Sequence, residues 1–297
     1  MTTTDAPRQA PATRSPRRGA YLAHAQASPA AVAAKDKRTW LALFADGGAV
    51  LDPVGTPACA KGAHTLGRSG GQDDLGRFYD CFIAPNTIRF EVARDLVAGR
   101  HVVRDVTIHT TGPSGISTPV PAHLVYTMAD GPGPITIERM EAFWQPADVM
   151  RTVRRAGARG AAATFLNVWQ LVRFFGFAGT RGYLRGIEER PRSSVARKSV
   201  GQWIEAVEAV RTGVAGEDDS ACEVELPGGE RVSMARALAA ELRGWTLEAE
   251  KILVCGWSAS CSLRMRCGDR ERHAVAVFDL ARPAARVRGV RLYWELE

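Results

Sequence analysis

The sequence lacks any Cys-x-x-Cys pair, and its six cysteines are spread over two long segments. Cys255, Cys261 and Cys267 are spaced by six residues, which is typical of small core residues rather than of a metal knuckle. His64 lies in a glycine-rich loop and His101 in a turn, and neither has a partner at a metal-ligand spacing. We therefore expect no metal, no cofactor and a reduced, cytoplasmic setting.

Most of the chain also lacks a strong charge of one sign. Residues 21–150 and 199–297 carry net charges of −2 and −3, whereas residues 1–20 and 151–198 carry +3 and +9. Because no basic stripe or aromatic ladder lies on a domain face, nucleic acid is not an expected partner. No apolar run follows Arg17-Arg18, so no targeting signal is predicted.

What is present predicts an α+β order. Residues 1–20 are rich in Thr, Pro, Ala and Arg and are expected to form a disordered tail. Helices are predicted over 29–44, with Ser28 as the N-cap, and over 73–82. Strands follow at 88–93, 96–97, 101–110, 119–128 and 135–143. This order predicts a curved antiparallel sheet wrapped around helices, a cone with an apolar pocket.

A repeat is visible in the second half of the chain. Residues 89–109 align without a gap on residues 246–266, with Gly99 opposite Gly256. The endings Glu141-Ala142-Phe143-Trp144 and Arg291-Leu292-Tyr293-Trp294 also agree, and an amphipathic helix over 200–210 answers the first helix. We therefore predict two tandem copies of one fold. Where the first copy has LDPVG the second has CEVELPGG, and Glu223 or Glu225 is only a loose substitute for Asp52, which indicates a degenerate copy.

The segment between the copies is basic and helical. Its apolar side chains recur at helical spacing (Phe165, Trp169, Val172 and Phe175). Asn167, Gln170 and Arg173 interrupt any membrane-spanning interpretation. We expect a helix that is docked on a core or covers a pocket, and an interfacial membrane helix is the alternative.

One carboxylate has an unusual setting. The helix before it carries an apolar stripe (Trp40, Leu43 and Phe44), a turn follows at 45–48, and a short strand ends at Asp52. Pro53 restricts Asp52 to the extended region and cannot donate to a ladder, so the acid should lie at a strand end. Such a carboxylate is either a solvated turn residue or a base in an apolar cleft.

The segment LFADGGAVLDPVG, followed by Gly76-Arg77-Phe78-Tyr79, resembles the signature of the ketosteroid isomerase branch of the nuclear transport factor 2-like superfamily. The resemblance covers residues 28 to 146. It implies the cone-shaped, cystatin-like roll and places the family's general base at Asp52. In ketosteroid isomerases the surroundings of the active-site carboxyl groups shift their pKa values, which is a standard example of such tuning. It also implies a ligand pocket lined by Trp40, Phe44, Val54, Phe78, Phe82 and Trp144.

The oxyanion donors of that family are not matched. Its helix tyrosine falls on Ser28, and its second acid falls near His123 or Leu124. His123 and Tyr126 are the nearest possible donors, on opposite faces of one strand. Arg104-Asp105 is similar to a motif of limonene epoxide hydrolase, but neighbouring strand residues point apart, so we expect an ion pair or surface charge.

These observations predict a first domain at 21–147, a basic helical linker at 148–198 and a second domain at 199–297. The leading function is an isomerase-like enzyme, of the steroid Δ-isomerase kind, that uses Asp52 on a ketosteroid or similar apolar carbonyl ligand. A polyketide cyclase or hydratase is the enzymatic alternative, and a non-catalytic lipid- or steroid-binding or interaction protein is the other class. The two copies are expected to pair within the chain or as a homodimer.

Overall fold

The computed structural model describes residues 17–67, 71–129, 131, 133–211, 222–233 and 242–295. The first half contains six strands: β1 (Phe44–Leu51), β2 (Cys59–Ala60), β3 (Thr87–Ala98), β4 (His101–Thr111), β5 (Ser117–Met128) and β6 (Ile137–Trp144). The helices α1 (Arg17–Ala33) and α2 (Lys37–Ala42) precede the sheet, and α3 (Asp74–Phe78) and the π-helical turn η1 (Tyr79–Ile83) lie between β2 and β3.

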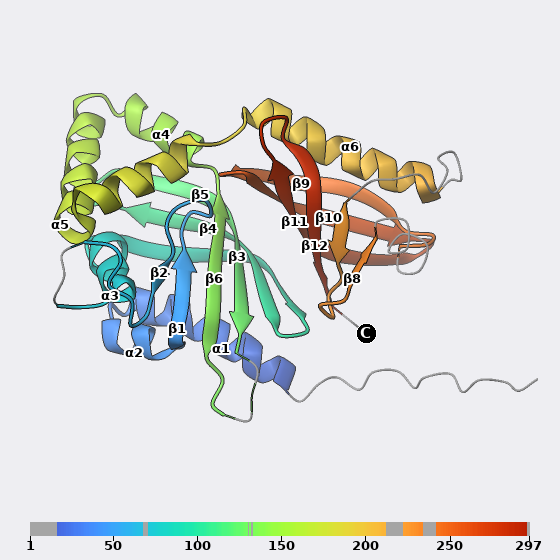
Figure 1. Ribbon diagram of the computed structural model, residues 1–297, viewed down its shortest axis with the longest axis horizontal. Coiled ribbons are helices and arrows are strands. Elements are labelled where there is room, and N and C mark those ends of the chain that lie inside the picture. The colour runs from blue at the N-terminus through green and yellow to red at the C-terminus, as the bar shows by residue number, and fades with distance from the viewer. Residues whose placement is uncertain are drawn as a thin grey trace, which may run out of the picture.

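The helices α4 (Pro146–Arg155) and α5 (Ala158–Glu188) follow the first sheet. The second half contains α6 (Ser193–Arg211) and six strands: β7 (Glu223–Glu225), β8 (Arg231–Ser233), β9 (Thr246–Cys255), β10 (Ser258–Cys267), β11 (Arg270–Ala281) and β12 (Arg286–Trp294). The strand orders are β2-β1-β6-β5-β4-β3 and β8-β7-β12-β11-β10-β9, so the second sheet repeats the connectivity of the first (Figure 1).

The prediction of two tandem copies is confirmed by this repeated order. The hairpins β3–β4 and β9–β10 turn at Gly99 and Gly256, whose φ angles are 58° and 57°. One feature of the predicted sheet was wrong, because β1 runs parallel to β6 and β7 runs parallel to β12. Each sheet is therefore mixed rather than purely antiparallel.

The first helix differs from its prediction. α1 begins at Arg17, within the predicted tail, and contains Pro29 in its interior, so Ser28 is not an N-cap. The chain then breaks at Lys35, whose φ is 57°, and α2 restarts with Asp36 accepting from the Thr39 amide at 3.0 Å. Residues 1–16 of the predicted tail lie outside the described residues.

Two more local predictions were wrong. The segment 45–48, expected to be a turn, lies within β1, which shifts register against β6 between Phe44 and Ala49. The two short strands expected at 88–93 and 96–97 form one strand, β3, with a bulge between Val92 and Arg94. In both places the pairing with a neighbouring strand decides the outcome, because the local glycines or charged residues alone do not specify it.

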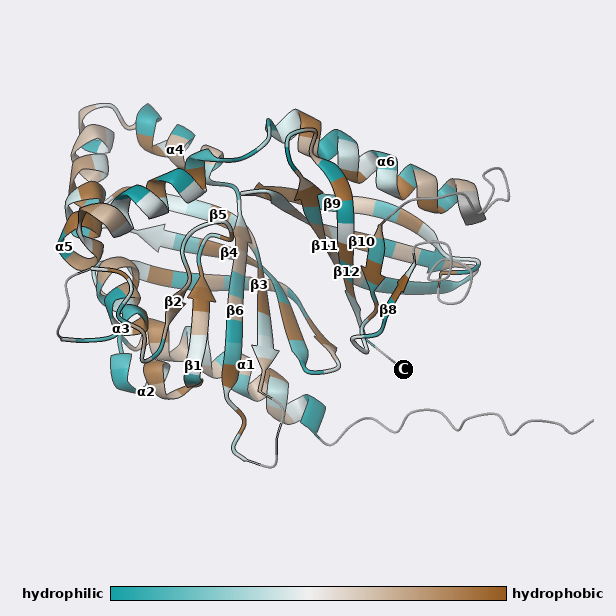
Figure 2. Ribbon diagram, in the orientation of Figure 1, coloured by the Kyte–Doolittle hydropathy of each residue, from teal (hydrophilic) through white to brown (hydrophobic). Residues whose placement is uncertain are grey.

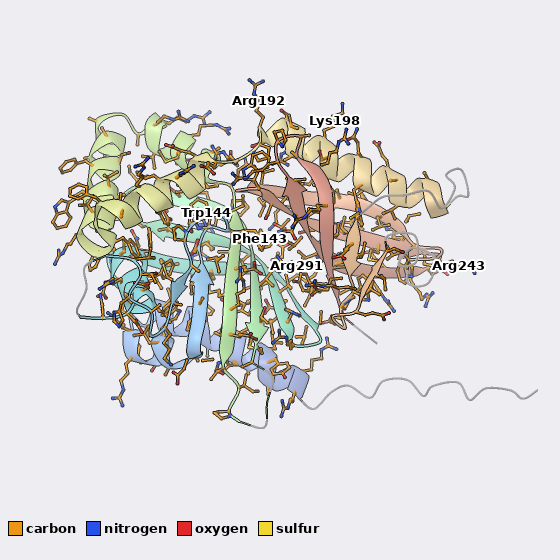
Figure 3. The ribbon with its side chains drawn as sticks, viewed as in Figure 1. Phe143, Trp144, Arg192, Lys198, Arg243 and Arg291 are labelled. Carbon is orange, nitrogen blue, oxygen red and sulfur yellow. The ribbon has the colours of Figure 1, made fainter. Side chains whose placement is uncertain are left out.

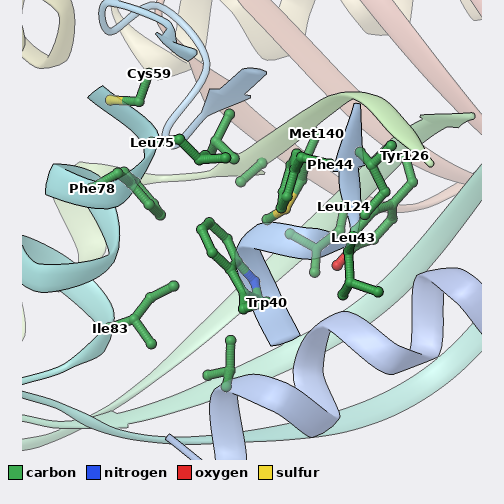
Figure 4. Packing of buried hydrophobic residues seen from close by; sticks show 14 of the residues in the cluster. Trp40, Leu43, Phe44, Cys59, Leu75, Phe78, Ile83, Leu124, Tyr126 and Met140 are labelled. Atoms are coloured by element: carbon green, nitrogen blue, oxygen red, sulfur yellow. The ribbon is translucent and has the colours of Figure 1, made fainter. Parts of the chain in front are cut away.

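The core of the first half lies between its helices and the concave face of its sheet. Trp40 is at its centre, with its ring 4.8 Å from that of Phe44 and 6.1 Å from that of Phe78 (Figure 4). Leu124 and Tyr126 reach the same core from β5. The three residues of the predicted stripe, Trp40, Leu43 and Phe44, are therefore all buried, but the helix ends at Ala42 and Phe44 already belongs to β1.

The two halves pack against each other through the opposite face of the first sheet. Val103, Val125 and Phe143 meet Val277 and Tyr293 in a separate apolar cluster. Polar contacts surround it, including the Arg291 guanidinium, which donates to Glu141 at 2.8 Å. Figure 3 shows Phe143, Trp144 and Arg291 at the centre of the molecule, where the two sheets meet.

α5 packs on the first half rather than acting as a separate spacer. Leu171 and Phe175 belong to the first core, and the helix changes direction at Gly176, whose φ is 65°. The predicted apolar stripe is only partly buried, because Phe165 and Trp169 keep 70% and 50% of their surface exposed. The buried face is rotated from the one that helical spacing indicated. None of the helices in the described ranges is long and apolar enough to cross a membrane.

Candidate functional site

A cavity of about 360 Å³ opens between the concave face of the first sheet and helices α1, α2, α4 and α5. Most of its wall is apolar. The strands contribute residues including Ile88, Ile108, Leu124 and Met140, and the helices contribute residues including Val32, Phe82, Val153 and Leu171. Such a wall suits an apolar ligand, and the few polar groups in it are candidates to orient that ligand.

Asp52 is the acidic side chain in the cavity wall. It follows the last residue of β1. The turn beyond Pro53 is held in place because the Val54 amide donates to the Ala142 carbonyl at 3.0 Å. The Trp144 indole N–H donates to Asp52 Oδ1 at 2.6 Å. Asp52 keeps part of its surface accessible although protein surrounds it, as expected for a carboxylate that faces a cavity. The acid therefore lies at a strand end, as predicted.

The chemistry of Asp52 follows from this setting. Burial disfavours the charged form and raises its pKa to about 6, although the hydrogen bond from Trp144 acts in the opposite direction. A carboxylate with such a pKa is a stronger base than an exposed one and remains mostly ionised at neutral pH. It can accept a proton from a carbon acid held against it.

Three polar side chains from different elements meet in another part of the cavity. Ser28 of α1, Trp40 of α2 and Tyr126 of β5 all line it. The Trp40 indole N–H donates to Ser28 Oγ at 3.1 Å, and the Ser28 side chain hydrogen-bonds the Tyr126 hydroxyl. Because an indole N–H can only donate, the Ser28 hydrogen is available for the Tyr126 oxygen. The Arg104 side chain also hydrogen-bonds the Tyr126 hydroxyl, and because a guanidinium only donates, the Tyr126 oxygen accepts there and its phenolic hydrogen can be directed at a ligand.

Arg104 lies behind Tyr126 on the neighbouring strand β4. Its side chain is 3% exposed, and its Nε donates to Asp95 Oδ1 at 2.8 Å. Burial raises the pKa of Tyr126, while the positive charge of Arg104 acts to lower it. Arg104 does not pair with Asp105, and these two neighbours point to opposite faces of the sheet. Each instead forms a structural ion pair with another residue, Arg104 with Asp95 and Asp105 with Lys251, as one of the two expectations from the sequence has it.

The predicted pocket residues divide into two groups. Trp40, Phe78, Phe82 and Trp144 line the cavity together with the candidate polar residues Asp52 and Tyr126. Phe44 and Val54 do not line it. Phe44 is fully enclosed in the core against Trp40, and Val54 belongs to the apolar cluster between the two halves.

His123 does not belong to the cavity. It is fully buried between the two sheets, where its ring nitrogens lie 2.7 Å from Ser260 Oγ and 2.7 Å from Ser262 Oγ. Tyr126, three residues further along β5, faces the cavity, as strand alternation predicts. The expectation that His123 could donate to a ligand in this cavity is therefore wrong, because the second half covers that face of the strand.

Tyr183 is a cavity residue that the sequence analysis did not single out. It comes from α5, its ring centroid is 5.1 Å from that of Phe82, and its hydroxyl donates to the Asp52 carbonyl at 3.3 Å. Burial and the charge of Asp52 raise its pKa well above the ordinary value. Tyr183 lies in a helical segment that was expected to dock on a core or cover a pocket. No residue spacing in the sequence connected Tyr183 with Asp52.

The Asp52 segment is held at a point where three backbones meet. A Cβ on Gly186 of α5 would come within 2.4 Å of the Gly55 carbonyl oxygen, and a Cβ on Gly256 would come within 3.0 Å of Gly55 Cα. The Cys255 thiol donates to the Val54 carbonyl at 3.0 Å. The second half therefore supports the turn that carries Asp52 without entering the cavity.

The second half has no equivalent of Asp52 among its described residues. Glu223 is exposed on β7, and Glu225 pairs with Arg231 at 3.3 Å. Neither glutamate lines the cavity of the first half. Within the described part of the chain, no group of three or more His, Cys, Asp or Glu side chains is placed to hold a metal ion.

Comparison with protein families gives one match at this site. Residues 25–132, which include Asp52 and Tyr126, match the family model described as the SnoaL-like domain. This similarity lies entirely within the first half of the chain. The fold of the first half, six strands with helices on one face, is the nuclear transport factor 2-like arrangement that the resemblance implies. Comparison with curated proteins gave no match.

Several solved structures are similar to part of the chain. A Δ5-3-ketosteroid isomerase from a Mycobacterium species is 26% identical, with a TM-score of 0.35, over 43% of this chain and 95% of the other. A Mycobacterium tuberculosis protein in complex with estradiol-17beta-hemisuccinate is 22% identical, with a TM-score of 0.35, over 43% and 95%. The epoxide hydrolase/cyclase-like enzyme SalBIII is 18% identical, with a TM-score of 0.36, over 44% and 94%.

Proposed function

We propose that the SnoaL-like domain is an isomerase-like enzyme that moves a proton and a double bond on an apolar carbonyl ligand, such as a ketosteroid. The observation that carries the proposal is Asp52, a carboxylate of raised pKa in the wall of an otherwise apolar cavity. A ligand of mostly hydrocarbon character fits the wall, and its acidic carbon would lie against Asp52. No cofactor is needed for such a proton transfer.

In this proposal Asp52 takes the proton from the carbon next to the carbonyl group and returns it elsewhere on the ligand. The charge that develops on the carbonyl oxygen needs a hydrogen-bond donor. Tyr126 supplies it, because the chain from Trp40 through Ser28 leaves the phenolic hydrogen free. Tyr126 thus serves from β5 where the related family uses a tyrosine at the position of Ser28.

The decisive experiment compares Asp52→Asn with Asp46→Asn. Asp46 lies in β1 and Asp52 directly follows this strand. Asp46 is fully exposed and lies outside the cavity wall. Conversion of a Δ5-3-ketosteroid to its conjugated Δ4 isomer is followed by the ultraviolet absorbance of the enone. Asp52→Asn should lower the rate by roughly 10²–10⁴-fold, the usual share of general base catalysis, and Asp46→Asn should leave it unchanged.

Two other functions are compatible with the same cavity. A polyketide cyclase or hydratase would use Asp52 on a different carbonyl ligand, so polyketide-like substrates belong in the same assay. A non-catalytic steroid- or lipid-binding protein is favoured by one observation. The Trp144 indole N–H donates to Asp52 Oδ1 at 2.6 Å and so engages the carboxylate that a general base would use. Tight binding of the steroid with no turnover above buffer would reject the isomerase and support this second candidate.

The cellular setting remains a proposal. All six cysteines are free thiols. We infer a reducing, cytoplasmic location, in which such thiols persist.

A further inference from the structure

Exposed apolar side chains are concentrated on α4 and α5. Of the nine large apolar side chains that are exposed in the described residues, seven lie on these two helices: Met150, Phe165, Leu166, Val168, Trp169, Phe177 and Leu184. We call these seven the outer patch. Phe165, Trp169 and Phe177 are 70%, 50% and 82% exposed, which is unusual for aromatic side chains on a well-packed helix. Figure 2 shows hydrophobic residues along α5, at the end of the molecule away from the second sheet.

Arginines adjoin the aromatic residues of the outer patch. The Arg173 guanidinium lies 5.2 Å from the ring of Trp169, four residues earlier on the helix. Arg181 follows Phe177 by four residues and is exposed. Neither arginine forms an ion pair with a carboxylate within the described residues. Segment 151–198 as a whole has eleven basic residues and two acidic ones, so the patch lies in a strongly positive field.

The outer patch is continuous with the opening of the cavity. Met150, Leu166, Val168 and Leu184 are exposed and also line the cavity wall. The same side chains therefore face both the solvent and the ligand space. An apolar ligand that enters here passes directly across the outer patch.

We propose that the outer patch docks on an anionic lipid surface. Phe165, Trp169 and Phe177 insert at the boundary between headgroups and acyl chains, and Arg173 and Arg181 bind lipid phosphates and other anionic headgroups. Docking places the cavity opening against the bilayer. If the proposed function holds, the apolar ligand enters the cavity from the membrane. The docking itself does not depend on that function.

The chemistry of the patch favours lipid over a protein partner. A protein interface of this apolar content would need a complementary surface that buries the arginines or pairs them with carboxylates. An anionic bilayer satisfies both components at once, because aromatic rings and arginine side chains prefer the headgroup region. Asn167 and Gln170 on the same helix keep it at the surface rather than across the membrane.

Vesicle flotation of the full-length chain tests this proposal. Vesicles of phosphatidylcholine alone are compared with vesicles of phosphatidylcholine and phosphatidylserine, at low and at physiological salt. We expect flotation with the anionic vesicles and its weakening by salt. The Phe165→Ser/Trp169→Ser/Phe177→Ser variant should lose it. Arg173→Gln and Arg181→Gln should each lower the partition coefficient by about fivefold.

Matched controls separate docking from other effects. Val92→Ser/Val195→Ser removes two exposed apolar side chains elsewhere on the surface, and Arg89→Gln removes an exposed arginine of β3. These variants should float like the wild type, and so should Asp52→Asn. The three aromatic side chains do not line the cavity. The aromatic variant should therefore retain turnover of a dissolved substrate, so loss of docking and loss of the proposed activity are distinguishable.

Two results would overturn the proposal. The first is an absence of flotation with anionic vesicles, or flotation that the aromatic variant retains. The second is a wild-type protein that binds no lipid and has twice the mass of one chain in solution. The aromatic variant would then have the mass of one chain. That outcome would assign the outer patch to a contact between two copies of the chain.

Discussion

At the scale of single residues, the raised pKa of Asp52 predicts how activity depends on pH. The general base must be ionised, and burial raises its pKa to about 6. We expect kcat/KM for the isomerisation assay to rise with pH and reach half its plateau near pH 6. The profile is measured with a substrate that does not titrate in this range. A half-point near 4 would indicate a solvated carboxylate and would contradict the enclosed site.

The same raised pKa predicts that stability depends on pH in the opposite direction to activity, because the protonated Asp52 favours the folded state. A carboxyl group whose pKa is higher in the folded state stabilises the fold below its unfolded pKa of about 3.9, and this contribution is lost as pH rises through about 6. Asp52→Asn removes the buried charge and keeps the Oδ1 acceptor for Trp144. The variant should be more stable than the wild type at pH 8, by about 3 kcal/mol at most, and equally stable at pH 4. Urea unfolding at the two pH values measures this difference.

Tyr126 and Arg104 give a second prediction at this scale. Tyr126→Phe removes the proposed donor and should lower kcat by about 10²–10³-fold with little change in KM. Arg104→Met keeps Tyr126 but removes the charge that lowers its pKa, so we expect a smaller loss of kcat. Tyrosine titration by ultraviolet absorbance, compared with that of Tyr126→Phe, should place the pKa of Tyr126 higher in Arg104→Met. An unchanged titration would mean that Arg104 acts only through its ion pair with Asp95.

At the scale of elements, α5 connects the cavity wall to the segment that carries Asp52. Its C-terminal part presses Gly186 against Gly55 and supplies Tyr183 to the Asp52 carbonyl. Both contacts depend on the direction that the helix takes after Gly176. The helix is therefore part of the site, although it lies outside residues 25–132 that match the SnoaL-like domain.

This arrangement predicts the effect of one added methyl group. Gly186→Ala places a Cβ within 2.4 Å of the Gly55 carbonyl oxygen, and backbone on both sides leaves no flexible side chain to move away. The last turns of α5 must shift, so we expect a loss of stability of about 1–3 kcal/mol and a lower kcat. Gly201→Ala, on α6 with open space around the added Cβ, is the matched control and should be neutral or slightly stabilising. Thermal unfolding and the isomerase assay measure the two effects.

At the scale of the whole molecule, a buried polar cluster connects the two halves. His123 faces Ser260 and Ser262 of β10, and Ser262 donates to Asp105 at 2.7 Å, which also pairs with Lys251 of β9. Burial lowers the pKa of His123. Although burial acts to raise the pKa of Asp105, the hydrogen bonds and charges of His123 and Lys251 hold it well below the usual range. A neutral His123 that donates from Nε2 to Ser262 satisfies every member of this network.

The cluster predicts that mild acid weakens the molecule. The lowered pKa means that the unfolded chain binds a proton at His123 that the folded chain does not bind, so stability is lost as pH falls below about 6.5. Lys251 opposes protonation and Asp105 favours it. His123→Gln removes this titration, so its stability should change less than that of the wild type between pH 7 and pH 5. The comparison between the two proteins cancels the contribution of Asp52, which has the opposite sign in this range.

The sequence alone predicted the features that depend on local patterns. Strand alternation placed His123 and Tyr126 on opposite faces, and the order of elements predicted an α+β fold in two copies. The local arrangement placed Asp52 at a strand end before a proline but left open whether it was a solvated turn residue or a base in an apolar cleft. Only the resemblance of its segment to the ketosteroid isomerase signature singled it out as a base. The same local reasoning assigned an N-cap at Ser28 and a turn at 45–48, which helix extension and strand pairing overrode.

Only the tertiary structure decided which face of each element has a function. The face of β5 that carries His123 is closed because the second sheet packs on it, and the face that carries Tyr126 stays open to the cavity. Ser28, Trp40 and Tyr126 come from distant parts of the sequence, so no spacing could show that their hydroxyl and indole groups meet. The orientation of α5, which exposes Phe165 and Trp169, is set by its contacts with the first core. Such contacts join residues far apart in the chain, and hydrophobic periodicity specifies that a helix has an apolar face but not what covers it.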